Sequence, residues 1–405
     1  MSMNQTPTAN RHHIAFFGRR NTGKSSLINA VTGQDIALVS VIKGTTTDPV
    51  YKAMELLPLG PVVVIDTPGF DDEGELGEMR IERTRRVLNK ADAAVLVLDG
   101  ENSIDTLLPP EEELLSIFKA KNIPFIIALN KSDLVNKPQS LIPTWLENCK
   151  DSLVPVSAKT GLNIDLLKEK IAFLLQEIES KQKLVSDLIE PNDFIVLVIP
   201  IDESAPKGRL ILPQQQVIRD ILDSGATAIS VRDSELQQTL LNIGKKPSLV
   251  ITDSQVFAQV SALVPNDIPL TSFSILFARF KGFLDISVKG AETLDNIKDG
   301  DNILICEGCT HHRQCDDIGT VKIPNLIRNY SSAEPHFTIC SGGDFPQDLS
   351  PYKLIIHCGS CMLNEREMHY RRNLANEQNI PFTNYGITIA HIQGILRRSI
   401  EKLIN

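Results

Sequence analysis

Short apolar runs separated by polar segments mark the first part of the chain. Four of these runs have the length of a buried strand, at residues 12–18, 61–65, 93–100 and 125–130. Apolar residues at helical spacing follow the first run, and an amphipathic stretch covers roughly residues 164–180. Continuous apolar strands combined with helices are typical of an α/β domain with a parallel-containing sheet. We therefore predict such a domain at the N-terminal end of the chain.

The rest of the chain repeats the alternation of strands and helices. Beyond a polar linker come three strand-like runs, each followed by a helix-like stretch, at residues 194–200, 226–233 and 247–253. They predict a small α/β domain over residues 190–268. The region 269–405 begins with a helix-like segment, ends in an amphipathic helix and is also expected to be α/β. The predicted fold class is thus α/β throughout.

The composition narrows the class of protein. The chain has 42% hydrophobic and 22% charged residues, and no apolar run approaches the length that spans a bilayer. The N-terminal segment lacks the apolar core of a signal peptide, so we expect a cytoplasmic protein without a membrane partner. The formal net charge of -9 argues against nucleic acid as the main partner, because phosphate binding needs a concentrated basic surface.

A glycine-containing segment lies between the first strand-like run and the helix-like stretch that follows it. It reads Gly18-Arg-Arg-Asn-Thr-Gly-Lys-Ser, and this strand, loop and helix context is that of a phosphate-binding loop. Backbone N–H groups can wrap a phosphate, Lys24 supplies positive charge, and the Ser25 hydroxyl can bind Mg²⁺. The expected nucleotide-binding residues of the loop are Asn21, Thr22, Gly23, Lys24, Ser25 and Ser26.

Two further segments fit a site for Mg²⁺ and the γ-phosphate. The Gly-Thr-Thr-Thr-Asp segment at residues 44–48 stands where a switch segment would present a threonine to both of them. The apolar run that follows ends in Asp66-Thr-Pro-Gly69. This segment would place a carboxylate near Mg²⁺ and a glycine N–H near the γ-phosphate.

The remaining nucleotide motifs concern the base. The run at residues 125–130 ends in Asn130-Lys131-Ser-Asp133, at the strand end where open α/β sheets bind ligands. Asp133 can accept hydrogen bonds from the guanine N1–H and exocyclic amine, a pair of donors that adenine lacks. A backbone N–H of the segment Ser157, Ala158 and Lys159 can meet the guanine O6. The chain is therefore expected to bind GTP and GDP.

In order and sequence, these five motifs resemble those of the TrmE/Era-like GTPases, which read GxxNxGKS, GTTxD, DTPG, NKxD and SAK. The resemblance implies that Asn21 helps to bind K⁺ and that Thr46 binds Mg²⁺ together with Ser25. The candidate catalytic residues are then Lys24, Thr46 and Gly69. Phe70 stands where Ras-like proteins have a water-orienting glutamine, so we expect slow hydrolysis that K⁺, a rearranged switch or a partner assists.

Cysteines cluster near the C-terminal end. Six of the seven lie between residues 306 and 361, which suggests a metal site. Cys309-Thr-His311 forms a CxH pattern and His357-Cys358-Gly-Ser-Cys361 an HCxxC pattern, in which Gly359 is expected to permit the tight turn. Spacing alone favours zinc on Cys309, His311, Cys358 and Cys361. A [4Fe-4S] cluster on the three thiolates, with one exchangeable position, stays open.

The other cysteines of this region are Cys306, Cys315 and Cys340. We expect them to be free thiols of the core rather than ligands. Cys306 also forms a second CxxC pattern with Cys309 and could supply an alternative or fourth ligand.

The GTP motifs followed by CxH, about 45 residues and HCxxC resemble one family, the [FeFe]-hydrogenase maturation GTPases (HydF). The segments 205–214 and 311–326 also fit this family. The resemblance implies a [4Fe-4S] cluster on Cys309, Cys358 and Cys361, and reverses the preference for zinc. It implies three domains, for GTPase activity, dimerisation and cluster binding, at residues 1–180, 190–268 and 269–405.

The same resemblance implies a function. The protein would be a scaffold that accepts a di-iron precursor with CO and CN⁻ ligands, made with two radical-SAM maturases, and delivers it to the apo-[FeFe]-hydrogenase. GTP hydrolysis would switch partner exchange, and a homodimer would form through the middle domain. The candidates for a fourth cluster ligand are His311, His357 and Asp202.

Two other functions stay open at this point. One is an RNA-associated GTPase of the tRNA-modification or ribosome-assembly type with a structural zinc domain, which the acidic balance disfavours. The other is a redox sensor whose cysteines form reversible disulfides, and iron and sulfide content would separate it from the scaffold.

Overall fold

The computed structural model describes residues 8–34, 49–69, 84–101, 107–134, 152–176, 183–201, 210–308, 317–360 and 362–404. The chain divides into two compact units, Met1–Glu179 and Ser180–Asn405. Within the described ranges, no helix is long and apolar enough to cross a membrane.

Unit 1 is built on one six-stranded sheet. Its strands are β1 (His12–Phe17), β2 (Val50–Leu56), β3 (Gly60–Asp66), β4 (Ala93–Asp99), β5 (Phe125–Asn130) and β6 (Leu153–Pro155). They lie in the order β2-β3-β1-β4-β5-β6, and only β2 runs antiparallel to its neighbour. This mixed sheet confirms the predicted α/β class.

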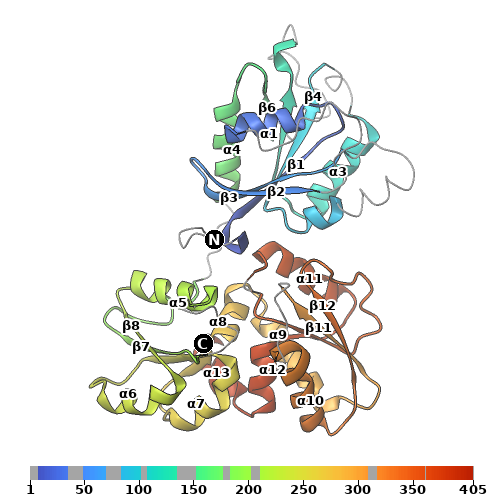
Figure 1. Ribbon diagram of the computed structural model, residues 1–405. Coiled ribbons are helices and arrows are strands. Elements are labelled where there is room, and N and C mark those ends of the chain that lie inside the picture. Colours follow the sequence, from blue (N-terminus) through green and yellow to red (C-terminus); the bar gives the residue numbers. More distant parts are fainter. Residues whose placement is uncertain are drawn as a thin grey trace. The chain divides into compact units, whose positions relative to one another are not determined.

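Helices cover both faces of this sheet (Figure 1). They include α1 (Lys24–Thr32), α3 (Pro109–Ala120) and α4 (Ile164–Gln176). Along β1, Ile14 and Phe16 join the core under α1 and α4, whereas Ala15 and Phe17 join the core under α3. Because both faces are buried, residues 14–17 of the strand are apolar at consecutive rather than at alternate positions.

Unit 2 contains two four-stranded sheets. The first has the order β10-β9-β7-β8 and the second β12-β11-β13-β14, and all neighbours are parallel. The first sheet consists of β7 (Phe194–Val198), β8 (Thr227–Val231), β9 (Leu249–Thr252) and β10 (Leu270–Ser272). The second consists of β11 (Asn302–Glu307), β12 (His336–Ser341), β13 (Leu354–His357) and β14 (Phe382–Asn384).

The helices of unit 2 follow these strands along the chain. With the first sheet come α5 (Leu212–Asp223), α6 (Leu236–Asn242), α7 (Phe257–Leu263) and α8 (Phe273–Phe280). With the second come α9 (Leu284–Ala291), α10 (Ile323–Ser331), α11 (Glu365–Glu377), α12 (Tyr385–Ile392) and α13 (Leu396–Ile404). One continuous apolar core joins the two sheets of the unit. The predicted division at residues 268 and 269 stays a prediction.

Candidate functional site

The phosphate-binding loop connects β1 to α1. Asn21 and Gly23 both have positive φ, 64° and 80°, and Gly23 is the N-cap of α1. A Cβ on Gly18 would lie 2.8 Å from the carbonyl oxygen of Val97, and one on Gly23 would lie 2.3 Å from Nδ2 of Asn130. Both glycines are therefore required, the first by close packing and the second by close packing and conformation together.

The predicted phosphate and Mg²⁺ residues meet at the carboxyl ends of β1 and β3. Lys24 forms an ion pair with Asp66, and the Ser25 hydroxyl donates to the other carboxylate oxygen of Asp66 at 3.2 Å. Thr67, next to Asp66, donates its hydroxyl to the carbonyl oxygen of Phe16 at 2.7 Å and so anchors the Asp-Thr-Pro-Gly segment to β1. An ammonium, a hydroxyl and a carboxylate thus lie together where phosphates and Mg²⁺ would bind.

Asn130 joins the base motif to the phosphate loop. Its side chain is buried, Nδ2 donates to the carbonyl oxygen of Thr22 at 2.9 Å, and Oδ1 accepts from the backbone N–H of Ala158 at 3.0 Å. One amide therefore connects three predicted motifs. The same side chain fills the space that a Cβ on Gly23 would need.

Around the base motif, Lys131 has a φ of 61° and donates Nζ to Asp99 Oδ2 at 2.8 Å. Asp133 is exposed in a short 3-10 turn, and Ser157 is buried and accepts from the N–H of Thr160 at 3.1 Å. Asp99 was not among the predicted residues. Its signal in the sequence was its place at the end of the apolar run 93–100, whose strand lies beside β5.

Three more of the predicted nucleotide-binding residues lie within the described ranges. Ser26 is exposed in the first turn of α1, Lys159 is exposed after β6, and Gly69 is half-buried at the end of its motif. The predictions that lie outside the described residues are Thr46, Phe70, Asp202, Cys309, His311, Cys315 and Cys361. Their roles stay predictions.

The described part of the cysteine region centres on the turn after β13. Cys358 Sγ accepts from the backbone N–H of Gly308 at 3.0 Å and from that of Ser360 at 3.4 Å. Such N–H donors stabilise a thiolate, which is the form that binds metals. The described ranges contain no group of three or more His, Cys, Asp or Glu side chains placed to hold a metal ion.

The conformation of this turn differs from the prediction at Gly359. The residue with positive φ is Ser360, at 58°, and Gly359 does not have one. A Cβ on Gly359 would lie 3.8 Å from the Ser274 hydroxyl, an ordinary contact. The expectation that Gly359 is needed for the turn is therefore wrong, because the left-handed position falls one residue later.

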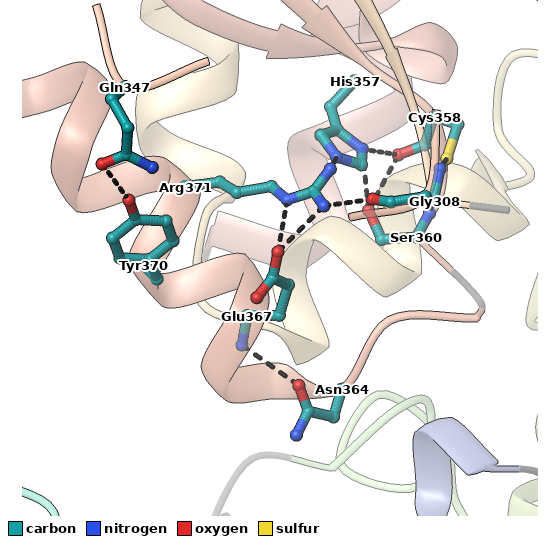
Figure 2. Close-up of polar contacts among 10 residues, drawn as sticks. Gly308, Gln347, His357, Cys358, Ser360, Asn364, Glu367, Tyr370 and Arg371 are labelled. Carbon is teal, nitrogen blue, oxygen red and sulfur yellow. Dashed lines mark hydrogen bonds and ion pairs between the residues drawn. The ribbon is translucent and has the colours of Figure 1, made fainter. Parts of the chain in front are cut away.

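A buried ionic network supports the turn from α11 (Figure 2). Arg371 is fully buried, and its guanidinium donates to Glu367 Oε1 at 2.9 and 3.0 Å, to His357 Nε2 at 3.0 Å and to the carbonyl oxygen of Gly342 at 2.5 Å. The other ring nitrogen of His357 lies 3.0 Å from Ser360 Oγ and 3.1 Å from the carbonyl oxygen of Cys358. Burial first, and the charge of Arg371 second, hold the pKa of His357 well below its usual range.

Two other cysteines lie side by side on neighbouring strands. Cys306 of β11 is buried and stands opposite Cys340 of β12 in the sheet register. Burial, and then the contact with Cys340, raise the pKa of Cys306, whereas the hydrogen bond from Cys306 lowers the pKa of Cys340. Neither thiol forms a disulfide, and their role as core thiols rather than ligands stays a prediction.

Three family models match the chain. Residues 13–131 match the model described as a 50S ribosome-binding GTPase. Residues 184–282 match the hydrogen maturase F dimerization domain, and residues 285–402 match the hydrogen maturase F tetramerization domain. The two maturase models together cover more than half of the chain and include the turn after β13.

Curated relatives and solved structures are similar to a part of the chain. The tRNA modification GTPase MnmE of Streptococcus pyogenes serotype M1 is 32% identical over 206 residues, which are 46% of this chain and 42% of the relative. The MnmE of Hamiltonella defensa is 33% identical over 160 residues, or 39% of this chain and 34% of the relative. This chain thus spans less than half of the length of these relatives.

Among solved structures, a probable GTP-binding protein engB is 26% identical, with a TM-score of 0.33, over 41% of this chain and 99% of that one. A variant of Aquifex aeolicus Era bound to GDP·AlF₄⁻ is 20% identical, with a TM-score of 0.37, over 54% and 92% of the two chains. The motifs meet on a mixed sheet in unit 1, and both maturase-specific models match unit 2. The chain therefore belongs to the hydrogen maturase F family of GTPases.

Proposed function

We propose that this protein is a GTP-driven scaffold that holds a [4Fe-4S] cluster, accepts a di-iron precursor and transfers it to an apo-[FeFe]-hydrogenase. The observation that supports this most is the presence of both maturase-specific models in a chain that also has a GTPase domain. The likeness to MnmE concerns less than half of the chain, so a role in tRNA modification is the weaker proposal.

In unit 1, the residues of the chain would bind and cleave the nucleotide. Lys24 leaves its pairing with Asp66 to contact the β- and γ-phosphates, while Ser25 and Thr46 bind Mg²⁺. Asp133 reads the guanine edge, and Asn21 helps to bind K⁺ beside the phosphates. Hydrolysis then moves the switch segments and changes which partner is bound.

In unit 2, the cluster would be held by Cys309, Cys358 and Cys361. Gly308 and Ser360, whose N–H groups contact Cys358 Sγ, are the chain neighbours of the other two cysteines, so the described turn fits a thiolate site. When bound by three thiolates, a [4Fe-4S] cluster keeps one iron open to an exchangeable ligand, which suits a cargo that must bind and leave. We propose Asp202 or His311 for the fourth position.

Self-association follows from the family models, and its geometry is a proposal. Among the strands that the structure describes, β8 ends the first sheet of unit 2 beside β7 alone, and the nearby Leu222 and Leu241 are 56% and 74% exposed. An open strand edge next to exposed apolar side chains favours pairing with a second copy. We therefore propose a homodimer through the β8 edge.

A transfer assay tests the proposed function. The chain is produced together with the two radical-SAM maturases, purified without oxygen and added to apo-[FeFe]-hydrogenase, and hydrogen evolution is measured. We expect activation by the wild type and none by Cys358→Ala. A wild-type protein that is produced with both maturases and still fails to activate the apoenzyme would refute the scaffold role.

A further inference from the structure

The two halves of unit 2 have the same architecture. Read from the other end, the second sheet has the order β14-β13-β11-β12, which matches β10-β9-β7-β8 strand for strand. In each half a three-residue strand leads into an eight-residue helix, capped by the side chain of Ser272 in α8 and of Asn384 in α12. Gly282 and Gly394 follow these helices with φ of 70° and 69°. The first half is therefore an internal reference for what this fold requires.

The second half differs from this reference at buried positions around the cysteine turn. The last residue of β9 is Thr252, and the last residue of β13 is His357. Helix α7 covers the first sheet with the apolar Phe257 and Val260, whereas α11 buries Arg371. The first half forms the same sheet without a buried ion on this helix, so the fold alone does not explain the ionic network.

The hydrogen bonds of His357 leave neither ring nitrogen open. An arginine N–H can only donate, so Nε2 of His357 must accept from Arg371, and the ring proton lies on Nδ1. Nδ1 then donates to the turn, at the carbonyl oxygen of Cys358 or at Ser360 Oγ. His357 thus connects Arg371 to the turn and has no lone pair left for a metal.

A second buried cation reaches the turn from the first half. Lys281, at the end of α8, is 6% exposed and donates Nζ to the carbonyl oxygens of Ser360 and, at 3.0 Å, of Leu363. Ser360 is fully buried in a left-handed conformation, which a serine adopts only when its surroundings hold it there. The residue equivalent to Lys281 after α12 is the uncharged Gln393.

From these contacts we propose that Arg371 and Lys281 are positioning residues that clamp the turn after β13 from two sides. Arg371 acts through His357, and Lys281 acts on the backbone around Ser360. The clamp holds the Cys358 thiolate and the backbone of Ser360 in one arrangement for metal binding. In this respect the inference rests on the proposed function, and it assigns His357 a bridging role instead of the ligand role left open by the sequence.

Hydrogen exchange of the metal-free full-length protein tests the clamp directly. We expect Arg371→Lys, which keeps the charge but loses the planar fork of the guanidinium, to speed exchange of amides at residues 354–364 by at least about tenfold, the factor for one lost charged hydrogen bond. Lys281→Met should act in the same way. Exchange at the wild-type rate in both variants would overturn the proposal.

Arg398→Met is the matched control. Arg398 also donates to several backbone carbonyl oxygens, those of Ser261, Val264, Pro265 and Ile268, but these belong to the segment around α7. We expect this variant to leave exchange at residues 354–364 unchanged. Because no cluster is present, this comparison decides the clamp even if the proposed function fails.

Spectroscopy of the reconstituted protein separates positioning from mere stability. Loss of a buried cation beside the thiolates should move the reduction potential of the cluster to more negative values in Lys281→Met, but not in Arg398→Met. Pulsed EPR detects an imidazole nitrogen that is bound to iron. Because His357 is not expected to be a ligand, the His357→Asn variant should give the same nitrogen coupling as the wild type. A nitrogen coupling lost in that variant, or an unchanged potential in Lys281→Met, would contradict the inference.

Discussion

Substitution of Asn130 by alanine should damage unit 1 even when no nucleotide is bound. Its buried amide connects the carbonyl oxygen of Thr22 to the N–H of Ala158. Alanine would remove both hydrogen bonds and leave their backbone partners without them. At about 1 to 1.5 kcal/mol for each bond, the free energy of unfolding should fall by about 2 to 3 kcal/mol.

This loss corresponds to a drop of about 4 to 12 °C in the melting temperature of a unit of this size. The measurement is a thermal scan of the nucleotide-free protein, followed by titration with a fluorescent GDP analogue. We expect Asn130→Ala to lower both the melting temperature and the affinity.

Asp133→Asn is the control that separates loss of nucleotide binding from loss of stability. Asp133 is exposed, so its substitution should weaken guanine binding and leave the melting temperature of the nucleotide-free protein unchanged. If Asn130→Ala melts within about 1 °C of the wild type, the amide does not connect the motifs and the reasoning fails.

Three further substitutions test other parts of the account. Asn21→Ala should abolish the preference of GTP hydrolysis for K⁺ over Na⁺ in a phosphate-release assay, and a preserved preference would exclude Asn21 from the K⁺ site. Ser230→Pro should shift the dimer to monomer in sedimentation experiments. The N–H of Thr227 points to β7, so that of Ser230 points away from it, and proline at this position blocks only the open edge. An intact dimer would place the interface elsewhere. Tyr385→Phe should raise the free energy of unfolding of the metal-free protein, measured in urea, by about 1 kcal/mol, because the buried hydroxyl has no hydrogen-bond partner in the described structure. A clear loss of stability would show that the hydroxyl does form a hydrogen bond.

Local patterns in the sequence predicted the elements of unit 1 well. The runs at residues 12–18, 61–65, 93–100 and 125–130 correspond to β1, β3, β4 and β5. These strands are buried on both faces, so the middle of each is continuously apolar and stands out from the polar loops. The phosphate loop was also predictable, because glycine spacing directly reflects its backbone conformation.

Contacts between distant segments were beyond such patterns. Asn130 meets the phosphate loop across 108 residues, and Lys281 meets the cysteine turn across 79. From the sequence alone, Arg371 is expected to lie on a solvated helix face, but the structure buries it. Burial of an arginine depends on acceptors that other elements supply, and these do not show in the local pattern. The prediction for the turn failed for a related reason. Glycine adopts the left-handed backbone most easily, which pointed to Gly359, but hydrogen bonds stabilise this backbone at Ser360 instead.

We propose above that unit 2 holds an iron-sulfur cluster on the thiolates around the turn after β13. The most direct test is the content of iron, acid-labile sulfide and zinc in anaerobically purified wild type and Cys358→Ala, with an EPR spectrum after reduction. The account predicts about four irons and four sulfides per chain, and a reduced cluster signal that the variant loses. About one zinc per chain without sulfide would contradict it and would favour the RNA-associated GTPase with a structural zinc domain.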